Sequence, residues 1–395
     1  MPHVLIIGGG AAGLAAAITV ARAGAQVTVV EKAGRVGTRI LSTGNGRCNL
    51  SNSALDTSGG CAAYNDPAFV RPVLARVTCT AVREFFAGLG LLTVADDSGR
   101  VYPRTNTAHS VLDVLYSAVG RLGVTVECGR GIHTITPVHA NGTAVTGYEA
   151  LDEVGHTHIA SRLIIAYGNS TFTQALDAQP QAVRVPVLGP LKARRDAVKG
   201  LDGVRAACKA TLMRDGAPCA QEEGELLFRD YGVSGIPAFD LSRFAQPGDT
   251  LSLDFFAEYS EHALSSLLEA RQRCLAGISA HEYLDGLLHR RVALAVLRSL
   301  GIAPDASAAN LLPAKLASAL KDYRLVVTGG PARSQAQVMR GGYATSHVNA
   351  ETMESAAYPG VFIVGEALDV DARCGGFNLH WAWASGLTAG AAVCE

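Results

Sequence analysis

Residues 4–13 read VLIIGGGAAG, and the next apolar run, VTVVE, ends at Glu31. Gly8, Gly10 and Gly13 form a G-x-G-x-x-G pattern where an apolar strand gives way to an alanine-rich helix over residues 11–23. Gly8 permits the tight turn, Gly10 lets the backbone touch a pyrophosphate, and Gly13 allows close packing of strand and helix. The order of strand, glycine triplet, helix, strand and acid predicts a β-α-β unit that binds a dinucleotide.

We expect the pyrophosphate at the N-terminus of this helix. Unpaired backbone N–H groups and the positive end of the helix dipole meet an anion there. Glu31 follows Gly13 at the spacing of a carboxylate that binds the ribose hydroxyls.

The composition describes a globular protein. The chain has 395 residues, 48% of them hydrophobic and 17% charged, with a formal net charge of −1. This length suits two or three domains. We expect no nucleic-acid partner, because no overall basic field attracts phosphates, although a modest basic cluster within residues 184–199 leaves that question open.

The cysteines and the apolar N-terminal stretch bear on the compartment. The nine cysteines lack metal-ligand spacing, and no signal peptide is recognisable, so we expect no metal and reduced thiols in the cytoplasm. Glycines and Arg22 interrupt the apolar stretch over residues 4–30, so we expect no membrane association.

The order of the predicted elements indicates an α/β fold with a split dinucleotide-binding domain. We assign residues 1–185 to its first part and residues 323–395 to its C-terminal part. Residues 186–322 are predicted to form an inserted domain, which is β-rich over 186–258 and helical over 259–322.

The C-terminal tail favours FAD over NAD as the dinucleotide. A late apolar strand ends in Gly365-Glu366, and Gly375-Gly376-Phe377-Asn378 opens the last helix. Bare N–H groups at such a helix N-terminus suit the flavin pyrimidine edge, where negative charge collects on reduction. The sequence has no second glycine triplet after a strand and no C-x-x-C motif. NADPH or NADH is therefore a candidate only as a transient electron donor in the substrate cavity.

Three blocks resemble the BaiN/YhiN-type, aminoacetone-oxidase-like family of FAD-dependent flavoproteins. They are TGNGRCNLSN (43–52), GELLFRDYGVSG (224–235) and the tail over residues 352–386. The resemblance implies a split Rossmann-like FAD-binding domain of the three-layer ββα, glutathione-reductase-like type. The chain departs from the family pattern in the segment AYGNSTFTQ (166–174), and at His347 and His380. These departures favour a divergent small-molecule substrate.

The motifs and the resemblance together define the expected sites. The residues expected to bind FAD are Gly8, Gly10, Ala12, Gly13, Glu31, Lys32, Arg39, Gly44, Gly365, Glu366, Asp369, Gly376, Phe377, Asn378 and Leu379. Arg104, Asn49 and Tyr231 are candidate substrate contacts.

Three residues are candidates for the chemistry. Arg47 is a candidate to stabilise a phosphate or negative charge on the flavin. Cys48 is a candidate proton donor, with a buried inert thiol as the alternative. His380 is a candidate proton shuttle, with a packed helix histidine as the alternative.

We expect an FAD-dependent oxidoreductase that transfers a hydride between flavin N5 and a small organic substrate. NAD(P)H-driven reduction of an activated C=C or C=N bond is slightly favoured. Oxidation of a small amine, synthesis of dihydrouridine in ribosomal RNA, and a non-catalytic FAD-binding redox sensor remain the alternatives.

Overall fold

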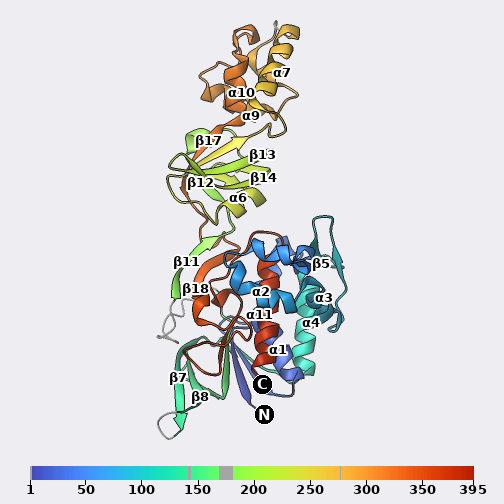
Figure 1. Cartoon of the computed structure of the whole chain (residues 1–395), viewed down its shortest axis with the longest axis vertical. Coiled ribbons are helices and arrows are strands. Elements are labelled where there is room, and N and C mark those ends of the chain that lie inside the picture. Colours follow the sequence, from blue (N-terminus) through green and yellow to red (C-terminus); the bar gives the residue numbers. More distant parts are fainter. Residues whose placement is uncertain (1, 141–143, 169–180, 276) are drawn as a thin grey trace. The chain divides into compact units, whose positions relative to one another are not determined.

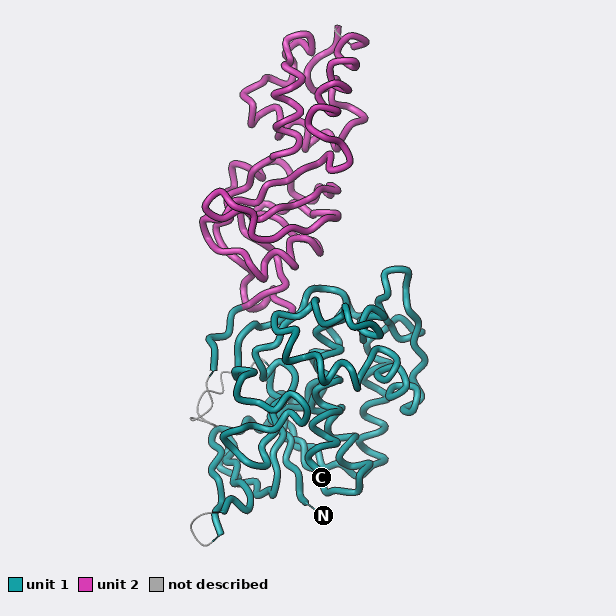
Figure 2. The backbone as a smooth tube through the Cα atoms, viewed as in Figure 1, with its two compact units in different colours: residues 1–185, 338–395 teal, residues 186–337 magenta. Residues whose placement is uncertain are grey.

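The computed structural model describes residues 2–140, 144–168, 181–275 and 277–395. The chain forms two compact units, shown in different colours in Figure 2. Unit 1 comprises residues 1–185 and 338–395, and unit 2 comprises residues 186–337. Among the described residues, no helix combines the length and the apolar character that crossing a membrane requires.

A parallel sheet forms the centre of unit 1. Its strands, in spatial order, are β19 (Val361–Ile363), β10 (Arg162–Ile165), β1 (His3–Ile7), β2 (Gln26–Glu31) and β6 (Thr125–Cys128). Residues Val4 to Ile7 are at most 4% exposed, as expected for strands covered on both faces. Ile7 pairs with both Val30 and Ile165, so the carboxyl ends of three strands lie together at one edge.

Helices α1 (Ala11–Arg22) and α11 (Phe377–Ala392) pack against each other beside this sheet (Figure 1). A Cβ at Gly386 would lie 2.4 Å from the Ala12 carbonyl oxygen, and one at Gly390 would lie 3.0 Å from that of Ala16. The missing side chains therefore allow close approach of the two backbones. The first and last helices of the chain are joined in this way.

The remaining elements of unit 1 complete its layers. Strands β7 (Ile132–Ala140), β8 (Ala144–Asp152) and β9 (Thr157–Ala160) form an antiparallel meander. The other helices are α2 (Pro67–Arg76), α3 (Cys79–Ala87) and α4 (Ala108–Arg121). Short strands are β3 (Ser51–Asn52), β4 (Thr93–Ala95), β5 (Arg100–Pro103), and the pair β11 (Gln181–Val187) and β18 (Val338–Tyr343). The 3-10 segments are η1 (Ile40–Gly46), η2 (Ser53–Asp56), η3 (Ser58–Ala63), η5 (Thr345–His347) and η6 (Gly365–Ala367). The predicted split Rossmann-like fold is confirmed.

Unit 2 contains a closed barrel and a group of helices. The barrel order is β12 (Leu191–Ala193), β15 (Gly232–Ser234), β14 (Ala217–Arg229), β13 (Arg205–Arg214), β16 (Thr250–Asp254) and β17 (Tyr323–Gly329). The helices are α5 (Arg195–Val198), α6 (Ile236–Leu241), α7 (Glu261–Cys274), α8 (Ala280–Leu284), α9 (Arg290–Ser299), η4 (Ala308–Asn310) and α10 (Pro313–Lys321).

Strand β17 differs from its assignment by sequence. Residues 323–329 were assigned to the C-terminal part of the FAD-binding domain, but they pair with β12 and β16 and close the barrel. Unit 2 accordingly extends to residue 337. An apolar run in the sequence does not reveal its partner strands, and here those partners belong to the insertion.

Candidate flavin-binding site

The first glycine loop shows which glycines the protein itself requires. Gly8 has φ +110°, and a Cβ there would lie 2.8 Å from the Ala166 carbonyl. A Cβ at Gly13 would lie 1.9 Å from the Gly8 oxygen. At Gly10, in contrast, a Cβ would have no described atom within 4 Å beyond its chain neighbours. Gly8 and Gly13 are therefore needed for packing, whereas the bare side of Gly10 is open to a ligand.

Helix α1 begins beside that open side. Gly10 is its N-cap residue and provides no side-chain cap, and Ala12 lies in the first turn. The first N–H groups of a helix have no partner within the helix. Together with the helix dipole they form an anion site, which fits a pyrophosphate.

Glu31 is held at the end of β2, directly beside the glycine loop. Its Oε2 accepts a hydrogen bond from the Gly9 amide at 2.7 Å, and its Oε1 accepts one from the Ala33 amide at 2.8 Å. Both carboxylate oxygens are thus fixed by backbone amides at the glycine loop, and the ribose contact of Glu31 stays a prediction. Lys32 instead forms an exposed ion pair with Glu153, at 2.7 Å.

A second glycine turn opens helix α11. Gly375 and Gly376 have φ +124° and +100°, and Gly376 is the N-cap residue without a side-chain cap. A Cβ at Gly376 would lie 2.4 Å from the Ser51 carbonyl oxygen and 2.7 Å from Asn49 Oδ1. The turn is therefore packed directly on the loop 43–52, which belongs to the other end of the chain.

Asn49 Oδ1 is a buried acceptor at this turn. Among the described residues it has no hydrogen-bond partner, and a buried polar atom of this kind normally has one. The pyrimidine edge of a flavin presents an N–H donor flanked by two carbonyl oxygens. Asn49 Oδ1 can accept from the flavin N–H, and the free N–H groups at the start of α11 can donate to a flavin carbonyl oxygen. The residues present therefore fit FAD at both glycine turns.

The loop between these turns has an unusual backbone. Gly44, Asn45 and Cys48 adopt φ values of +56°, +56° and +58°. A Cβ at Gly44 would lie 2.9 Å from the Asn49 amide nitrogen. The loop therefore folds back on itself, so that Gly44, an expected FAD contact, packs against the backbone of Asn49, an expected substrate contact.

Cys48 and Arg47 differ sharply in environment. Burial raises the pKa of the Cys48 thiol to about 12, although a hydrogen bond with Thr43 opposes the shift. Cys48 is therefore a protonated, fully buried thiol. The exposed Arg47 guanidinium stacks over the Tyr102 ring at 4.9 Å, and its Nε donates to the Gly44 carbonyl at 3.3 Å.

His380 is fully buried, and both ring nitrogens are engaged. Nε2 lies 2.9 Å from the Val77 carbonyl oxygen, and Nδ1 lies 2.8 Å from Ser51 Oγ. A carbonyl only accepts, so Nε2 carries the hydrogen and Nδ1 accepts from Ser51. Burial lowers the pKa of His380 to about 4. This neutral imidazole joins α11 to two other segments, a geometry that favours a positioning role over proton transfer.

Asn378 also stabilises the second turn internally. Its Oδ1 accepts from the Ala372 amide and its Nδ2 donates to the Ala372 carbonyl, both at 2.8 Å. Phe377 is buried, and its carbonyl accepts from the Tyr64 hydroxyl at 2.8 Å. Leu379 is half-buried. These contacts hold the turn in shape.

A third segment brings the late acidic residues to the glycine loop. Gly365 has φ +60°, and a Cβ there would lie 2.9 Å from the Ala12 Cβ. The adjacent Glu366 accepts from Arg39 Nη1 at 2.9 Å and from the Met339 amide at 2.8 Å.

Asp369 lies in the same segment as Glu366. Its Oδ1 accepts from the Gly341 amide at 2.8 Å. Both carboxylates therefore accept hydrogen bonds from backbone N–H groups of β18.

Three supporting residues, Arg340, Asn65 and Ser385, were not predicted. Arg340 Nε pairs with the buried Asp371 at 2.7 Å, Asn65 accepts from the Asp371 amide at 2.9 Å, and Ser385 Oγ accepts from the Gly365 amide at 2.9 Å. Each contact joins segments far apart in the chain. We find no local sequence signal that could have revealed them.

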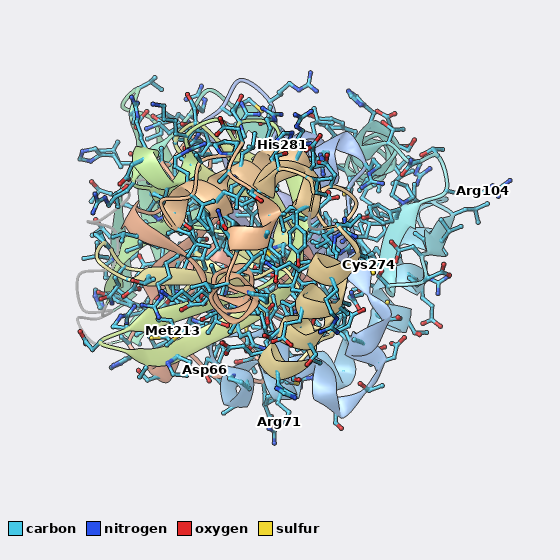
Figure 3. All side chains as sticks on the ribbon, turned by 90° about the horizontal axis from the view of Figure 1, so that it is seen from above. Asp66, Arg71, Arg104, Met213, Cys274 and His281 are labelled. Atoms are coloured by element: carbon cyan, nitrogen blue, oxygen red, sulfur yellow. The ribbon has the colours of Figure 1, made fainter. Side chains whose placement is uncertain are left out.

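No described contact brings Arg104, a predicted substrate residue, to these turns. Arg104 is exposed, and Figure 3 shows its side chain extending outward at the edge of the view. Tyr231 lies in the turn between β14 and β15 of unit 2, where its carbonyl accepts from the Ala193 amide at 2.9 Å. Within the divergent segment 166–174, residues 169–174 lie outside the described residues.

Comparison with solved structures agrees with the fold. A 3-ketosteroid-delta4-(5alpha)-dehydrogenase from Rhodococcus jostii RHA1, in complex with 4-androstene-3,17-dione, aligns with all of this chain and 97% of its own, with a TM-score of 0.50. The sequences are 15% identical, so the likeness concerns the fold alone.

Relatives in sequence extend over the whole chain. The 3-dehydro-bile acid delta(4,6)-reductase of Clostridium scindens is 33% identical over 417 residues, which covers 100% of both chains. The ribosomal RNA dihydrouridine synthase of Escherichia coli is 25% identical over 398 residues, covering 96% of this chain and 95% of its own.

The family model described as the HI0933-like protein Rossmann domain matches residues 2–392. This match and the full-length relatives confirm the predicted resemblance and the assignment as an FAD-dependent oxidoreductase. The chain therefore belongs to the HI0933-like Rossmann-domain family of flavoproteins.

Proposed function

We propose that this protein reduces a carbon–carbon double bond conjugated to a carbonyl group in a small, largely apolar, steroid-like molecule, with NADPH or NADH as the electron donor. The observation that carries the proposal is the full-length, 33% identity to a relative named as a bile acid reductase. In the balanced reaction, the nicotinamide gives up a hydride, and the alkene gains a hydride on one carbon and a proton on the other.

The two glycine turns support this chemistry. FAD held at these two turns would supply the hydride-transfer chemistry that links the nicotinamide to the alkene. The N-terminus of α11 would stabilise negative charge at the pyrimidine edge through its N–H groups and dipole. Asn49 Oδ1 would accept a hydrogen bond from the same edge, which accounts for its lack of a partner among the described residues.

Among the three predicted catalytic residues, Arg47 is best suited to act on the substrate. Its exposed guanidinium can stabilise negative charge that develops on the substrate carbonyl oxygen. Cys48 has a pKa near 12, and both nitrogens of His380 are engaged. We therefore assign neither residue to proton delivery.

An anaerobic two-step titration tests the proposal. NADPH or NADH should bleach the visible flavin band of the purified protein, and a 3-oxo steroid with a conjugated double bond should then restore it without oxygen. The saturated 3-oxo steroid is the matched control and should restore nothing. Failure of both nicotinamides to bleach the flavin would contradict the proposal. A reduced flavin that oxygen reoxidises but the conjugated steroid does not would contradict it as well. Bleaching by small amines would favour the amine oxidase.

Dihydrouridine synthesis in ribosomal RNA is a second candidate, because relatives that are 25% identical carry that name. The net charge of −1 does not favour it, since RNA backbones are bound through arrays of Lys and Arg. Incubation of the protein with unmodified ribosomal RNA and NADPH separates the two. Formation of dihydrouridine, with no turnover of the conjugated steroid, would replace our proposal.

A further inference from the structure

A second cluster of polar side chains lies at the edge of the parallel sheet in unit 1. Glu127 belongs to β6, the outermost strand, while His156 precedes β9 and His158 lies within it. One ligand atom from each of the three residues lies within 4.8 Å of the others. The cluster thus joins the end of the parallel sheet to the β7–β8–β9 meander.

The two histidines have the spacing of metal ligands. His156 Nδ1 and His158 Nε2 are 3.3 Å apart. Two imidazole nitrogens at about 2.0–2.1 Å from a tetrahedral Zn²⁺ are separated by about 3.3 Å. The rings meet edge to face, at an interplanar angle of 74°. The separation of these two nitrogens therefore matches that of two ligands on one tetrahedral Zn²⁺.

The charges around the histidines are also suited to a cation. The buried Asp152 carboxylate lies 3.3 Å from His158 Nε2 and accepts from Arg130 Nη1 at 2.9 Å. Arg130 Nε lies 3.2 Å from Glu127 Oε2. Two carboxylates and one guanidinium leave a net negative charge next to the histidines. A carboxylate has two oxygens, so Glu127 can keep Arg130 on one and bind a metal with the other.

We propose that Glu127, His156 and His158 form a structural site for a transition-metal dication, with Zn²⁺ as the best match. Two imidazoles and one carboxylate suit Zn²⁺, whereas Mg²⁺ and Ca²⁺ prefer oxygen ligands alone. His156 is exposed, so water can take the fourth position. The metal would fix the meander to the edge strand of the sheet.

The test uses the full-length, FAD-loaded protein without a histidine tag, after dialysis against a chelator. Calorimetric titration with ZnCl₂ should show one Zn²⁺ per chain, and saturating Zn²⁺ should raise Tm by roughly 5 °C. His156→Ala should weaken Zn²⁺ binding at least about 100-fold and abolish the Tm shift. The exposed His133 lies on β7 of the same meander, and His133→Ala should bind Zn²⁺ like the wild type.

A second variant protects the test from misfolding. Glu127→Gln keeps the size of the side chain and should also weaken Zn²⁺ binding, with an unchanged circular dichroism spectrum. Absence of one-to-one binding in the wild type would overturn the proposal, leaving a hydrogen-bonded histidine pair only. Equal binding by the wild type and His156→Ala, or an equal Tm shift with Mg²⁺, would overturn it as well.

Discussion

The glycine loop before α1 and the glycine turn before α11 use the same device at opposite ends of the chain. Both place a bare helix N-terminus, without a side-chain cap, beside a parallel strand end or a tight loop. They differ in what requires the glycines. Gly8 and Gly13 contact backbone of the same β-α unit and of the neighbouring strand end, whereas Gly376 contacts the distant loop 43–52.

This difference teaches how one cofactor site can be assembled from separate segments. The first turn combines a local contact, between Gly13 and the Gly8 carbonyl, with a contact of Gly8 to Ala166 at the neighbouring strand end. The second turn depends on contacts among segments far apart in the sequence, including the pairing of His380 with Ser51 and Val77. We therefore expect substitutions at Gly13 and Gly376, where a Cβ would meet protein backbone, to affect folding and FAD binding together. Gly10 has open space around it, so a substitution there should affect FAD binding alone.

The largest effect is expected at Gly13. Gly13→Val would place side-chain atoms against the Gly8 carbonyl, where even a Cβ would be 1.9 Å away. We expect a loss of at least about 3 kcal/mol in the free energy of unfolding and a protein that does not retain FAD. Urea denaturation and the flavin absorbance of the purified protein measure these effects.

Gly10→Ala is the matched comparison within the same loop. The open space around Gly10 predicts a change of less than about 1 kcal/mol in apoprotein stability. FAD binding should nevertheless weaken at least about 100-fold, because the methyl group occupies the side open to the pyrophosphate. Equal FAD affinity of Gly10→Ala and wild type would contradict the assignment of this loop.

The next largest effect is a pH dependence caused by His380. Burial holds its pKa near 4 in the folded state, below the ordinary value of 6.5. Between these values the unfolded chain binds a proton that the folded protein does not. The free energy of unfolding should therefore fall by about 3 kcal/mol as the pH drops from 6.5 to 4.

Urea titrations of wild type and His380→Gln across this range isolate the effect from the carboxylates that titrate there. His380→Gln should be less stable at pH 7, because it loses an imidazole that satisfies both Ser51 and Val77. Its pH slope should be the shallower of the two. Parallel slopes would show that His380 is accessible to protons.

A smaller effect is expected at the second turn. Gly376→Ala forces a Cβ onto φ +100° and to within 2.4 Å of the Ser51 carbonyl oxygen, which should cost about 2 kcal/mol of stability. FAD affinity should fall with it, because the turn must shift. Gly34→Ala has open space around it and serves as the control. A Tm of Gly376→Ala within 1 °C (about the precision of the measurement) of that control would contradict the packing.

The smallest and sharpest effect is expected at Asn49. Asn49→Ala removes a buried oxygen that has no partner among the described residues, so apoprotein stability should stay unchanged or rise by up to about 1 kcal/mol. FAD affinity should fall about tenfold, the loss expected for one hydrogen bond. Asn378→Ala, which removes two bonds to Ala372, should instead destabilise the apoprotein. A destabilised Asn49→Ala apoprotein would show that this oxygen does form a hydrogen bond within the protein.

Much of the fold was accessible from local pattern. Gly13 and Glu31 could be predicted because their contacts, with Gly8 and with the amides of Gly9 and Ala33, lie within the β-α-β unit. Gly8 could be predicted from its place in the glycine motif, although a Cβ there would meet the distant Ala166. The C-terminal turn was recognised through its glycines and its resemblance to a family, but the contacts of Gly376 with Ser51 and Asn49 could not be. These residues are more than 300 positions apart in the chain, and local sequence pattern does not show that they are neighbours in space.

By itself, the sequence determined the dinucleotide-binding unit, its split by an insertion, and the family. These follow from the period of apolar residues and from the spacing of glycines that a tight turn and close packing demand. Only the tertiary structure decided that β17 closes the barrel, that His380 is a neutral imidazole, and that Glu127 meets two histidines. Strand pairing, burial and ligand spacing arise from contacts between segments distant in the chain, which local pattern does not encode.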